Sequence, residues 1–153
     1  MPMWKITLAL SLLAAPLSAC RLPFEPTLEA ATAKAVARDL PILMLFTGSD
    51  WSLRSVTLDK ELLENQAIEK ILETSFILMM VDFPQRVKLA ATQQSTNTAL
   101  AEKFQVSHFP TLISLRPDGS EIGRLEFHAA TVDSMAKTLK GWLSQAGKTG
   151  QGN

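Results

Sequence analysis

Hydrophobic residues along the chain occur both in short continuous runs and in longer segments with helical spacing. Continuous apolar runs cover residues 41–47 and 76–83, and both are too short for a buried helix. Each run therefore predicts a central strand that is covered on both faces. Two further apolar runs, at 111–115 and 121–127, flank the sequence Arg-Pro-Asp-Gly-Ser. Because Pro-Asp-Gly favours a tight turn, these two runs predict a hairpin.

Segments rich in helix formers separate and flank these strands. Their spacing predicts helices at residues 27–40, 52–73, 97–106 and 131–145. The second helix should be interrupted near Asn65. Residues 84–96 are polar and fit either a loop or a loose helix. The order of elements predicts an α/β domain with a mixed central sheet and helices on both faces.

The first residues predict an export signal that is not part of the fold. Lys5 precedes an apolar run that is shorter than the ~20 residues of a membrane-spanning helix. Residues 17–20, Leu-Ser-Ala-Cys, resemble the bacterial lipobox, after which the cysteine becomes the lipid-bearing first residue. We therefore expect a lipoprotein-type signal peptide at 1–19 and a periplasmic protein that is anchored to a bacterial membrane by a lipid on Cys20. The alternative is an ordinary secreted protein with a cysteine near its mature end.

The rest of the chain predicts one domain with flexible ends. Residues 20–26 contain two prolines and predict a tether, residues 27–146 form the domain, and residues 147–153 predict a disordered tail. The chain has 153 residues, of which 46% are hydrophobic, so it can build an ordinary globular core. Its formal net charge is zero, which argues against a nucleic-acid partner held by bulk electrostatics.

Four stretches of the sequence resemble one known family. They are Phe-Thr-Gly-Ser-Asp-Trp at 46–51, Leu-Asp-Lys-Glu-Leu-Leu at 58–63, Met-Val-Asp-Phe-Pro at 80–84, and a long stretch at 100–127 that contains Phe-Pro-Thr and Pro-Asp-Gly. The chain is similar here to exported bacterial thioredoxin-like proteins with the site pattern Phe-Thr-Gly-Ser-Asp-Trp-Cys-x-x-Cys. The resemblance spans most of residues 28–145 and implies a thioredoxin-like fold.

The resemblance also implies where the family's functional site lies. In the family, an attacking cysteine lies at a helix N-terminus, where the helix dipole lowers the thiol pKa, and a second cysteine follows one turn later. A proline, usually cis, faces them from a loop that presents backbone to an extended peptide. The matching positions are Ser52 and Ser55 for the cysteines and Pro110 for the proline. Since serine forms no disulfide and Cys20 is the only cysteine, we expect no dithiol redox chemistry, no catalytic residue and no cofactor.

The leading interpretation is a redox-inactive binding module. By the resemblance, Trp51, Ser52, Phe109, Pro110 and Thr111 line a groove that would hold an extended or unfolded exported polypeptide, or an envelope protein. One alternative is the family's thiol–disulfide oxidoreductase or isomerase activity, which the two serines disfavour. The other is a structural, lipid-anchored subunit that docks through its sheet edge or through the polar segment before the third helix.

Other chemistry at these positions has less support. Ser52 and Ser55 fit helix capping better than nucleophilic catalysis, because no Gly-x-Ser-x-Gly motif is present and no acid is placed to orient His108. Asp50, His108 and His128 could be proposed as metal ligands, but their spacing matches no tight zinc pattern. We therefore expect no metal site.

Overall fold

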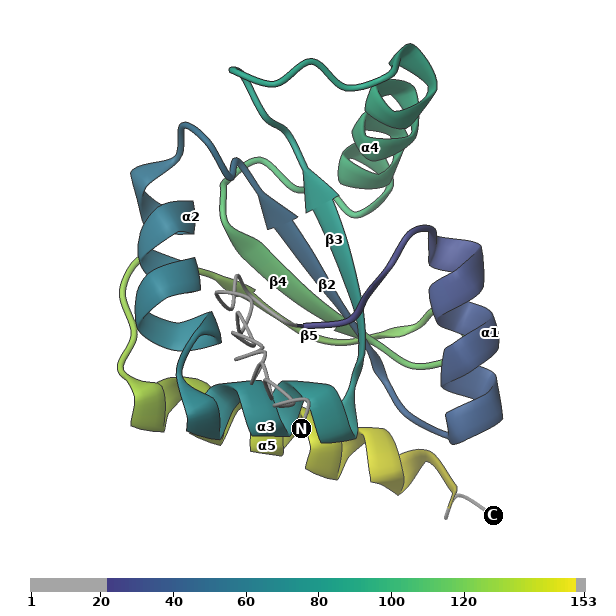
Figure 1. Ribbon diagram of the computed structural model, residues 1–153. Coiled ribbons are helices and arrows are strands. Elements are labelled where there is room, and N and C mark those ends of the chain that lie inside the picture. Colours follow the sequence, from purple (N-terminus) through teal and green to yellow (C-terminus); the bar gives the residue numbers. More distant parts are fainter. Residues whose placement is uncertain (1–21, 151–153) are drawn as a thin grey trace, which may run out of the picture.

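The computed structural model describes residues 22–150, with side chains up to residue 148, and its strands form one mixed sheet (Figure 1). The strand order is β1-β3-β2-β4-β5. The strands are Phe24–Glu25 (β1), Ile42–Thr47 (β2), Ile77–Asp82 (β3), Thr111–Leu115 (β4) and Glu121–Glu126 (β5). Strand β3 pairs in parallel with β1 and β2, whereas β4 runs antiparallel to both β2 and β5. The predicted hairpin and the mixed sheet are both confirmed.

Helices lie between the strands as the pattern predicts. They are Leu28–Arg38 (α1), Leu53–Leu58 (α2), Gln66–Ser75 (α3), Ala91–Lys103 (α4) and Val132–Ala146 (α5). A π-helical turn, Asp59–Leu63 (η1), extends α2, and a 3-10 turn, Gly147–Gly150 (η2), follows α5. The predicted interruption near Asn65 is confirmed, because the Asn65 side chain caps α3 by accepting the Ala67 N–H.

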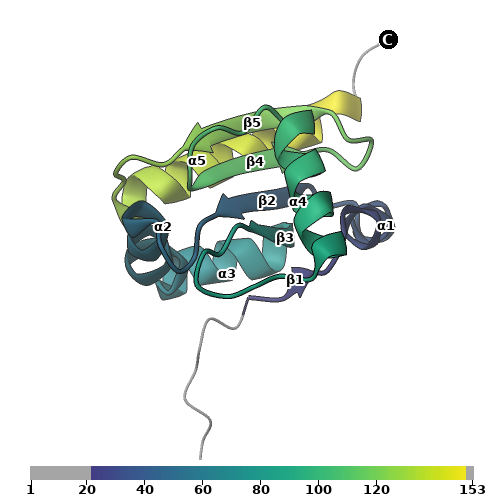
Figure 2. The ribbon, with the colours of Figure 1, turned by 90° about the horizontal axis from the view of Figure 1, so that it is seen from above.

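The sheet lies between two layers of helices. Helices α1 and α4 lie on one face, and α2, α3 and α5 lie on the other (Figures 1 and 2). Residues of β2 alternate between the two faces. Ile42, Met44 and Phe46 belong to the core under α1 and α4, and Leu43 and Leu45 belong to the core under the other helices. All of β2 is buried, which explains why its sequence is continuously apolar.

The fold differs from the expectation at both ends and around α4. Residues 20–26, expected as a tether, contain β1, and Leu22 is buried in the core. Helix α4 begins at Ala91, inside the polar segment that fitted either a loop or a loose helix. The expected tail starts with η2, and residues 151–153 lie outside the described residues. The predicted signal peptide and Cys20 also lie outside them.

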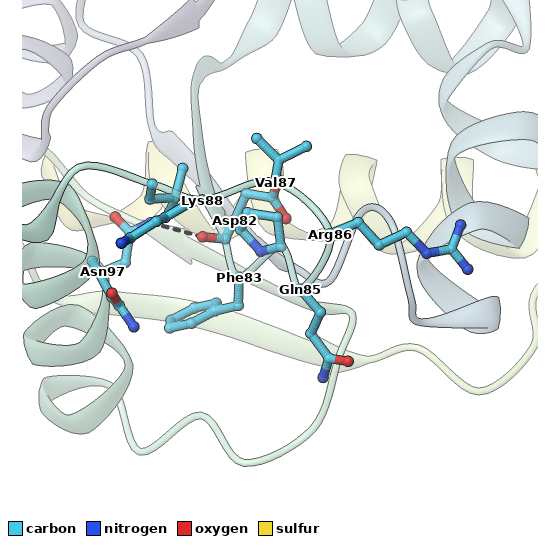
Figure 3. Close-up of a pocket in the computed structure, with 10 residues that line it drawn as sticks. Asp82, Phe83, Gln85, Arg86, Val87, Lys88 and Asn97 are labelled. Carbon is cyan, nitrogen blue, oxygen red and sulfur yellow. Dashed lines mark hydrogen bonds between the residues drawn. The ribbon is translucent and has the colours of Figure 1, made fainter.

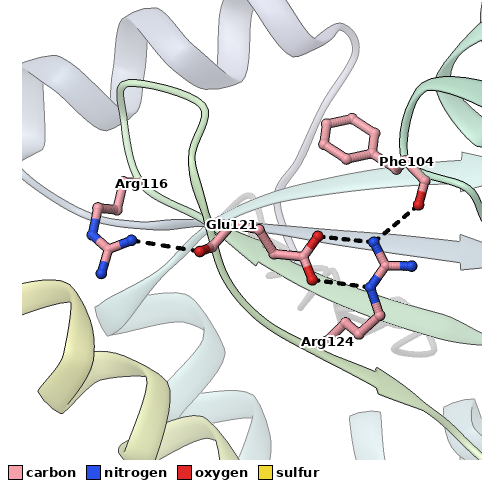
Figure 4. Close-up of polar contacts among 4 residues, drawn as sticks. All are labelled: Phe104, Arg116, Glu121 and Arg124. Atoms are coloured by element: carbon pink, nitrogen blue, oxygen red, sulfur yellow. Dashed lines mark hydrogen bonds and ion pairs between the residues drawn. The ribbon is translucent and has the colours of Figure 1, made fainter.

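Polar contacts attach the end of α4 to the outer strand of the sheet (Figure 4). The Arg124 guanidinium donates to both carboxylate oxygens of Glu121, at 2.9 and 2.8 Å, and to the carbonyl oxygen of Phe104 at 2.9 Å. Phe104 is the C-cap of α4. These bonds therefore fix the start of the chain segment that leads to Pro110. In the part of the chain from residue 22 to 150, no helix is long and apolar enough to cross a membrane.

Candidate functional site

The candidate site lies where β2 ends and α2 begins. The turn after Thr47 leads through Trp51 to Ser52, which is the N-cap of α2. The Ser52 Oγ accepts the Ser55 N–H at 3.3 Å, so Ser52 caps the helix as one of the sequence interpretations held. Ser55 is fully buried, and its Oγ accepts the Gly48 N–H at 3.2 Å. Both hydroxyls thus stabilise the junction between strand and helix.

The loop before β4 faces Ser52 as the resemblance implies. The Phe109–Pro110 peptide bond is cis, and the Ser52 hydroxyl donates to the Phe109 carbonyl at 3.4 Å. Pro110 and Thr111 are buried, and the Thr111 hydroxyl donates to the His108 carbonyl at 2.7 Å. Thr111 therefore stabilises the loop from inside. The Phe109 N–H donates no hydrogen bond to any of the described residues.

Three aromatic rings form a platform beside this loop. Trp51 is 42% exposed, and its Nε1–H donates to the Phe83 carbonyl at 2.7 Å. The Trp51 ring meets the Phe109 ring edge-on at 6.0 Å, and Phe83 stacks on Phe109 at 4.9 Å. Trp51 also lies directly over Gly48, where a Cβ would come within 2.6 Å of the indole. The glycine is therefore needed for the close approach of the ring.

Two carboxylates hold the turn before α2 in place. Asp50 accepts the backbone N–H groups of Gln85, Arg86 and Val87 at 2.8, 2.7 and 3.2 Å. The Gln85 N–H makes the largest contribution to lowering the pKa of Asp50 below its ordinary value. Asp82, at the end of β3, accepts the N–H of Ser49 at 3.0 Å and its hydroxyl at 2.6 Å. The loop after β3 is thus attached to the turn after β2.

One acid near the site has an environment that disfavours its charge. Asp59 is half-buried at the start of η1. Burial, with repulsion from Glu64 and Asp82, raises the pKa of Asp59 to about 6. The sequence analysis did not single out Asp59, because its burial follows from the packing of η1 against the sheet and not from a local motif.

The histidines have partners other than Ser52 and Ser55. His108 Nδ1 lies 3.0 Å from the Ser107 hydroxyl and 3.7 Å from a Glu126 carboxylate oxygen. His128 Nδ1 lies 3.3 Å from the Arg54 guanidinium. Among the described residues no hydrogen bond joins either histidine to Ser52, so the structure shows no hydrogen-bonded pair of nucleophile and base. Among residues 22–150 there is no group of three His, Cys, Asp or Glu side chains that could hold a metal ion.

Sequence reasoning did not predict the roles of three members of the site, Asp50, Asp82 and Phe83. Phe83 follows directly after a predicted strand, and its place in the aromatic platform depends on the tertiary packing of the Pro110 loop. Asp50 and Asp82 act over more than thirty positions along the chain. In the sequence, Asp50 stands in a Gly-Ser-Asp turn and Asp82 stands at the end of a strand. Acidic residues are common at both kinds of position, so neither could be assigned a role from the sequence.

This combination of fold and site defines the class of the protein. A model of the thioredoxin-like domain matches residues 28–140, so the chain belongs to the thioredoxin-like family. The family match confirms the thioredoxin-like resemblance and the predicted fold.

The chain is also similar to two proteins of Chlamydia pneumoniae. The chain is 27% identical over 129 residues to the "Disulfide bond reductase DsbH" of Chlamydia pneumoniae, covering 82% of this chain and 77% of the relative. It is 29% identical over 97 residues to the "Thioredoxin-related protein DsbJ" of the same organism. That match covers 63% of this chain but only 28% of DsbJ. The chain is thus similar to Dsb-type proteins through a thioredoxin-like domain.

Solved structures support the same fold. A structure titled "DsbH Oxidoreductase" superposes with a TM-score of 0.75 at 24% identity, covering 85% of this chain and 90% of the other. A thioredoxin from Thermus thermophilus gives a TM-score of 0.59 at 21% identity, covering 82% of this chain and 90% of the other. At these identities the likeness establishes the fold alone.

Proposed function

We propose that this chain is a redox-inactive thioredoxin-fold protein of the cell envelope that binds extended polypeptide through a groove. The groove comprises Trp51, Ser52, Phe109, Pro110 and Thr111. One combination of features supports the proposal. Serines stand at both positions that the resemblance assigns to cysteines, whereas the cis Phe109–Pro110 bond and the Trp51–Phe109 ring contact are present. A binding surface would thus persist without the redox step.

The Phe109 backbone supports binding of an extended chain. Its N–H is unpaired among the described residues, and its carbonyl receives one long bond, at 3.4 Å, from Ser52. An extended peptide lying along Phe109 would offer both a carbonyl and an N–H to these groups, as in strand addition. Thr111 and Pro110 contribute by holding this backbone in place.

Trp51 supports a side-chain contact beside that backbone. Its indole is 42% exposed, yet the bond to the Phe83 carbonyl and the packing on Gly48 fix its orientation. A ring that is already ordered loses little conformational entropy when a ligand covers it. Trp51 is therefore suited to anchor an apolar side chain of the bound polypeptide.

Redox inactivity follows from the chemistry of serine. The name of the DsbH relative describes a disulfide bond reductase. Thiol–disulfide exchange requires a thiolate attacking a disulfide, and Ser52 and Ser55 supply none. The single cysteine, Cys20, is proposed to carry the lipid, which would leave the mature domain without a free thiol. The purified protein is expected to reduce insulin no faster than the blank, and a clear thiol-dependent rate would contradict this part of the proposal.

The cellular location is part of the same proposal. Residues 1–19 are proposed to direct export, and Cys20 to carry the lipid that anchors the protein on the periplasmic side of a bacterial membrane. The partner is then an exported polypeptide or an envelope protein. Mass spectrometry of the membrane fraction is expected to find an acylated peptide beginning at Cys20. An unmodified mature end would contradict the anchor and leave the groove proposal intact.

An NMR titration tests the groove directly. The chain without residues 1–19 is titrated with an unfolded, cysteine-free polypeptide, and shifts are expected at Trp51, Ser52 and residues 108–111. Trp51→Ala should weaken binding, whereas Val36→Ala, at an exposed position on α1, should leave it unchanged. If no shifts appear at saturating polypeptide, the groove is not a polypeptide site. A partner bound elsewhere and unaffected by Trp51→Ala would favour the structural-subunit alternative.

A further inference from the structure

We infer that the loop between β3 and α4 forms a second part of the polypeptide site, a pocket that receives an acidic side chain next to the groove. This inference rests on the proposed function. The pocket has a volume of about 380 Å³ and is lined by residues 82–89 together with Gln94 and Asn97 of α4 (Figure 3). Phe83 belongs to both sites, because it lines the pocket and stacks on Phe109. A ligand can therefore extend from the groove into the pocket.

The walls of the pocket are fixed in the absence of a ligand. Asp50 holds the loop from one side through three backbone N–H groups. On the other side the Asn97 side chain donates to the Asp82 carbonyl at 2.8 Å, the dashed contact in Figure 3, and accepts from Gln93 at 2.7 Å. Asn97 is 3% exposed. A pocket held this firmly needs little reorganisation on binding.

The charges of the loop favour an acidic ligand. Arg86 and Lys88 are exposed, and within residues 22–150 neither side chain makes a hydrogen bond or an ion pair. The Arg86 side chain points away from Asp82 and Asn97 in Figure 3. The nearby carboxylates already have donors, since three loop N–H groups bind Asp50 and Ser49 binds Asp82. Besides the Gln85 N–H, the charge of Arg86 helps to lower the pKa of Asp50, but neither cation is held in an ion pair by a described residue, so both can bind a carboxylate from outside.

The ligand must also offer an apolar group. Val87 lies between the two cations and is 64% exposed, and Trp51 is exposed at the neighbouring groove. A surface that combines apolar side chains with two unpaired cations complements an apolar residue with acidic neighbours in an extended polypeptide. A long polyanion fits less well, because the site offers two cations and the formal net charge of the chain is zero.

The test uses fluorescence anisotropy with the chain without residues 1–19 and three labelled, cysteine-free peptides. The first contains the segment Asp-Leu-Glu, the second Asn-Leu-Gln, and the third Lys-Leu-Lys at the same place. The acidic peptide is expected to bind about tenfold more tightly than the amide peptide at low salt. The double variant Arg86→Glu and Lys88→Glu should abolish or reverse this preference. The matched variant Lys137→Glu and Lys140→Glu, on exposed positions of α5, should retain it.

The outcomes separate the pocket from the groove. Equal binding of the acidic and amide peptides would overturn the pocket and leave the groove proposal standing. If none of the peptides binds, the groove proposal fails as well. Binding to vesicles that contain anionic phospholipid is measured as well. Binding to them that the double variant abolishes, without any preference among the peptides, would show that the cations face a membrane and would also overturn the inference.

Discussion

The negative charge of Asp59 destabilises the folded protein. Its pKa is raised to about 6 from the ordinary value of 3.8, so the folded protein binds the Asp59 proton more tightly than the unfolded chain does. The resulting stabilisation is complete below about pH 4 and is lost as the pH rises to about 6. Asp59→Asn keeps the neutral form at every pH, and it should therefore be more stable than the parent above about pH 6.

The expected gain for Asp59→Asn is about 1 kcal/mol near neutral pH, after allowance for solvent screening of a half-buried group. Urea unfolding at several pH values measures it, and the difference should shrink towards zero near pH 4. Glu73→Gln, at an exposed position of α3, is the control and should show no such trend. A gain that is the same at all pH values would mean that packing, not charge, is responsible.

The proposed absence of redox chemistry depends on Ser52 and Ser55. The double variant Ser52→Cys and Ser55→Cys restores the family's pattern at the start of α2, one helical turn apart. It is expected to form an internal disulfide and to reduce insulin at a measurable rate. The single variant Ser52→Cys has no resolving thiol and should give no sustained turnover. If the double variant folds and stays inactive, the alignment of the site with the family's cysteines is wrong.

At the scale of elements, one carboxylate connects two loops. Asp50, in the turn before α2, organises the backbone of residues 85–87 in the loop after β3. Asp50→Asn leaves a single neutral acceptor oxygen, so at least one of the three N–H groups loses its bond and the others weaken. Amide hydrogen exchange at residues 85–87 should become about tenfold faster.

Asp118→Asn is the matched control for that change. Asp118 likewise accepts a backbone N–H, from Ser120, but in the β4–β5 turn. The Asp118→Asn variant should leave amide hydrogen exchange at residues 85–87 unaltered. Asp50→Asn should also weaken the preference for acidic peptides, because the loop that presents Arg86 and Lys88 would be less ordered. Unchanged exchange in Asp50→Asn would mean that other contacts hold this loop.

The elements that the sequence predicted best are those with a strong hydrophobic pattern. β2 and β3 are continuous apolar runs, and α5 has a clear apolar stripe, so their positions follow from local sequence. β1 is only two residues long and forms because β3 offers a free edge, which no local pattern reveals. α4 has few apolar residues in its first half, so its start could not be located.

In the candidate site, too, local motifs could be predicted from the sequence, whereas contacts between distant segments could not. Trp51, Ser52 and Pro110 could be placed because they lie in motifs that resemble a known family. The contacts that organise them could not, because Phe83 and Asp82 reach the site through parallel pairing of β3 with β2. A linear sequence gives no distance between two loops that follow different strands. The pocket lined by residues 82–89, Gln94 and Asn97 depends on that distance.

At the scale of the whole molecule, the N-terminal segment belongs to the domain. Leu22 is 6% exposed in the core, Phe24 and Glu25 extend the sheet, and Glu25 pairs with Lys34 of α1. The proposed lipid on Cys20 would therefore be separated from the buried core by Arg21 alone. Such a short link would hold the β1 edge of the sheet close to the membrane and would restrict how the groove can face its partner.

This arrangement predicts a large loss of stability when the segment is removed. A chain that begins at Thr27 loses the burial of Leu22 and part of Phe24, and its free energy of unfolding should fall by about 2–4 kcal/mol relative to a chain that begins at Arg21. Urea unfolding of the two proteins measures the difference. Leu22→Ala in the longer chain should reproduce about half of it. Equal stability of the two chains would show that residues 21–26 act as a flexible tether, and the membrane would then place no constraint on the groove.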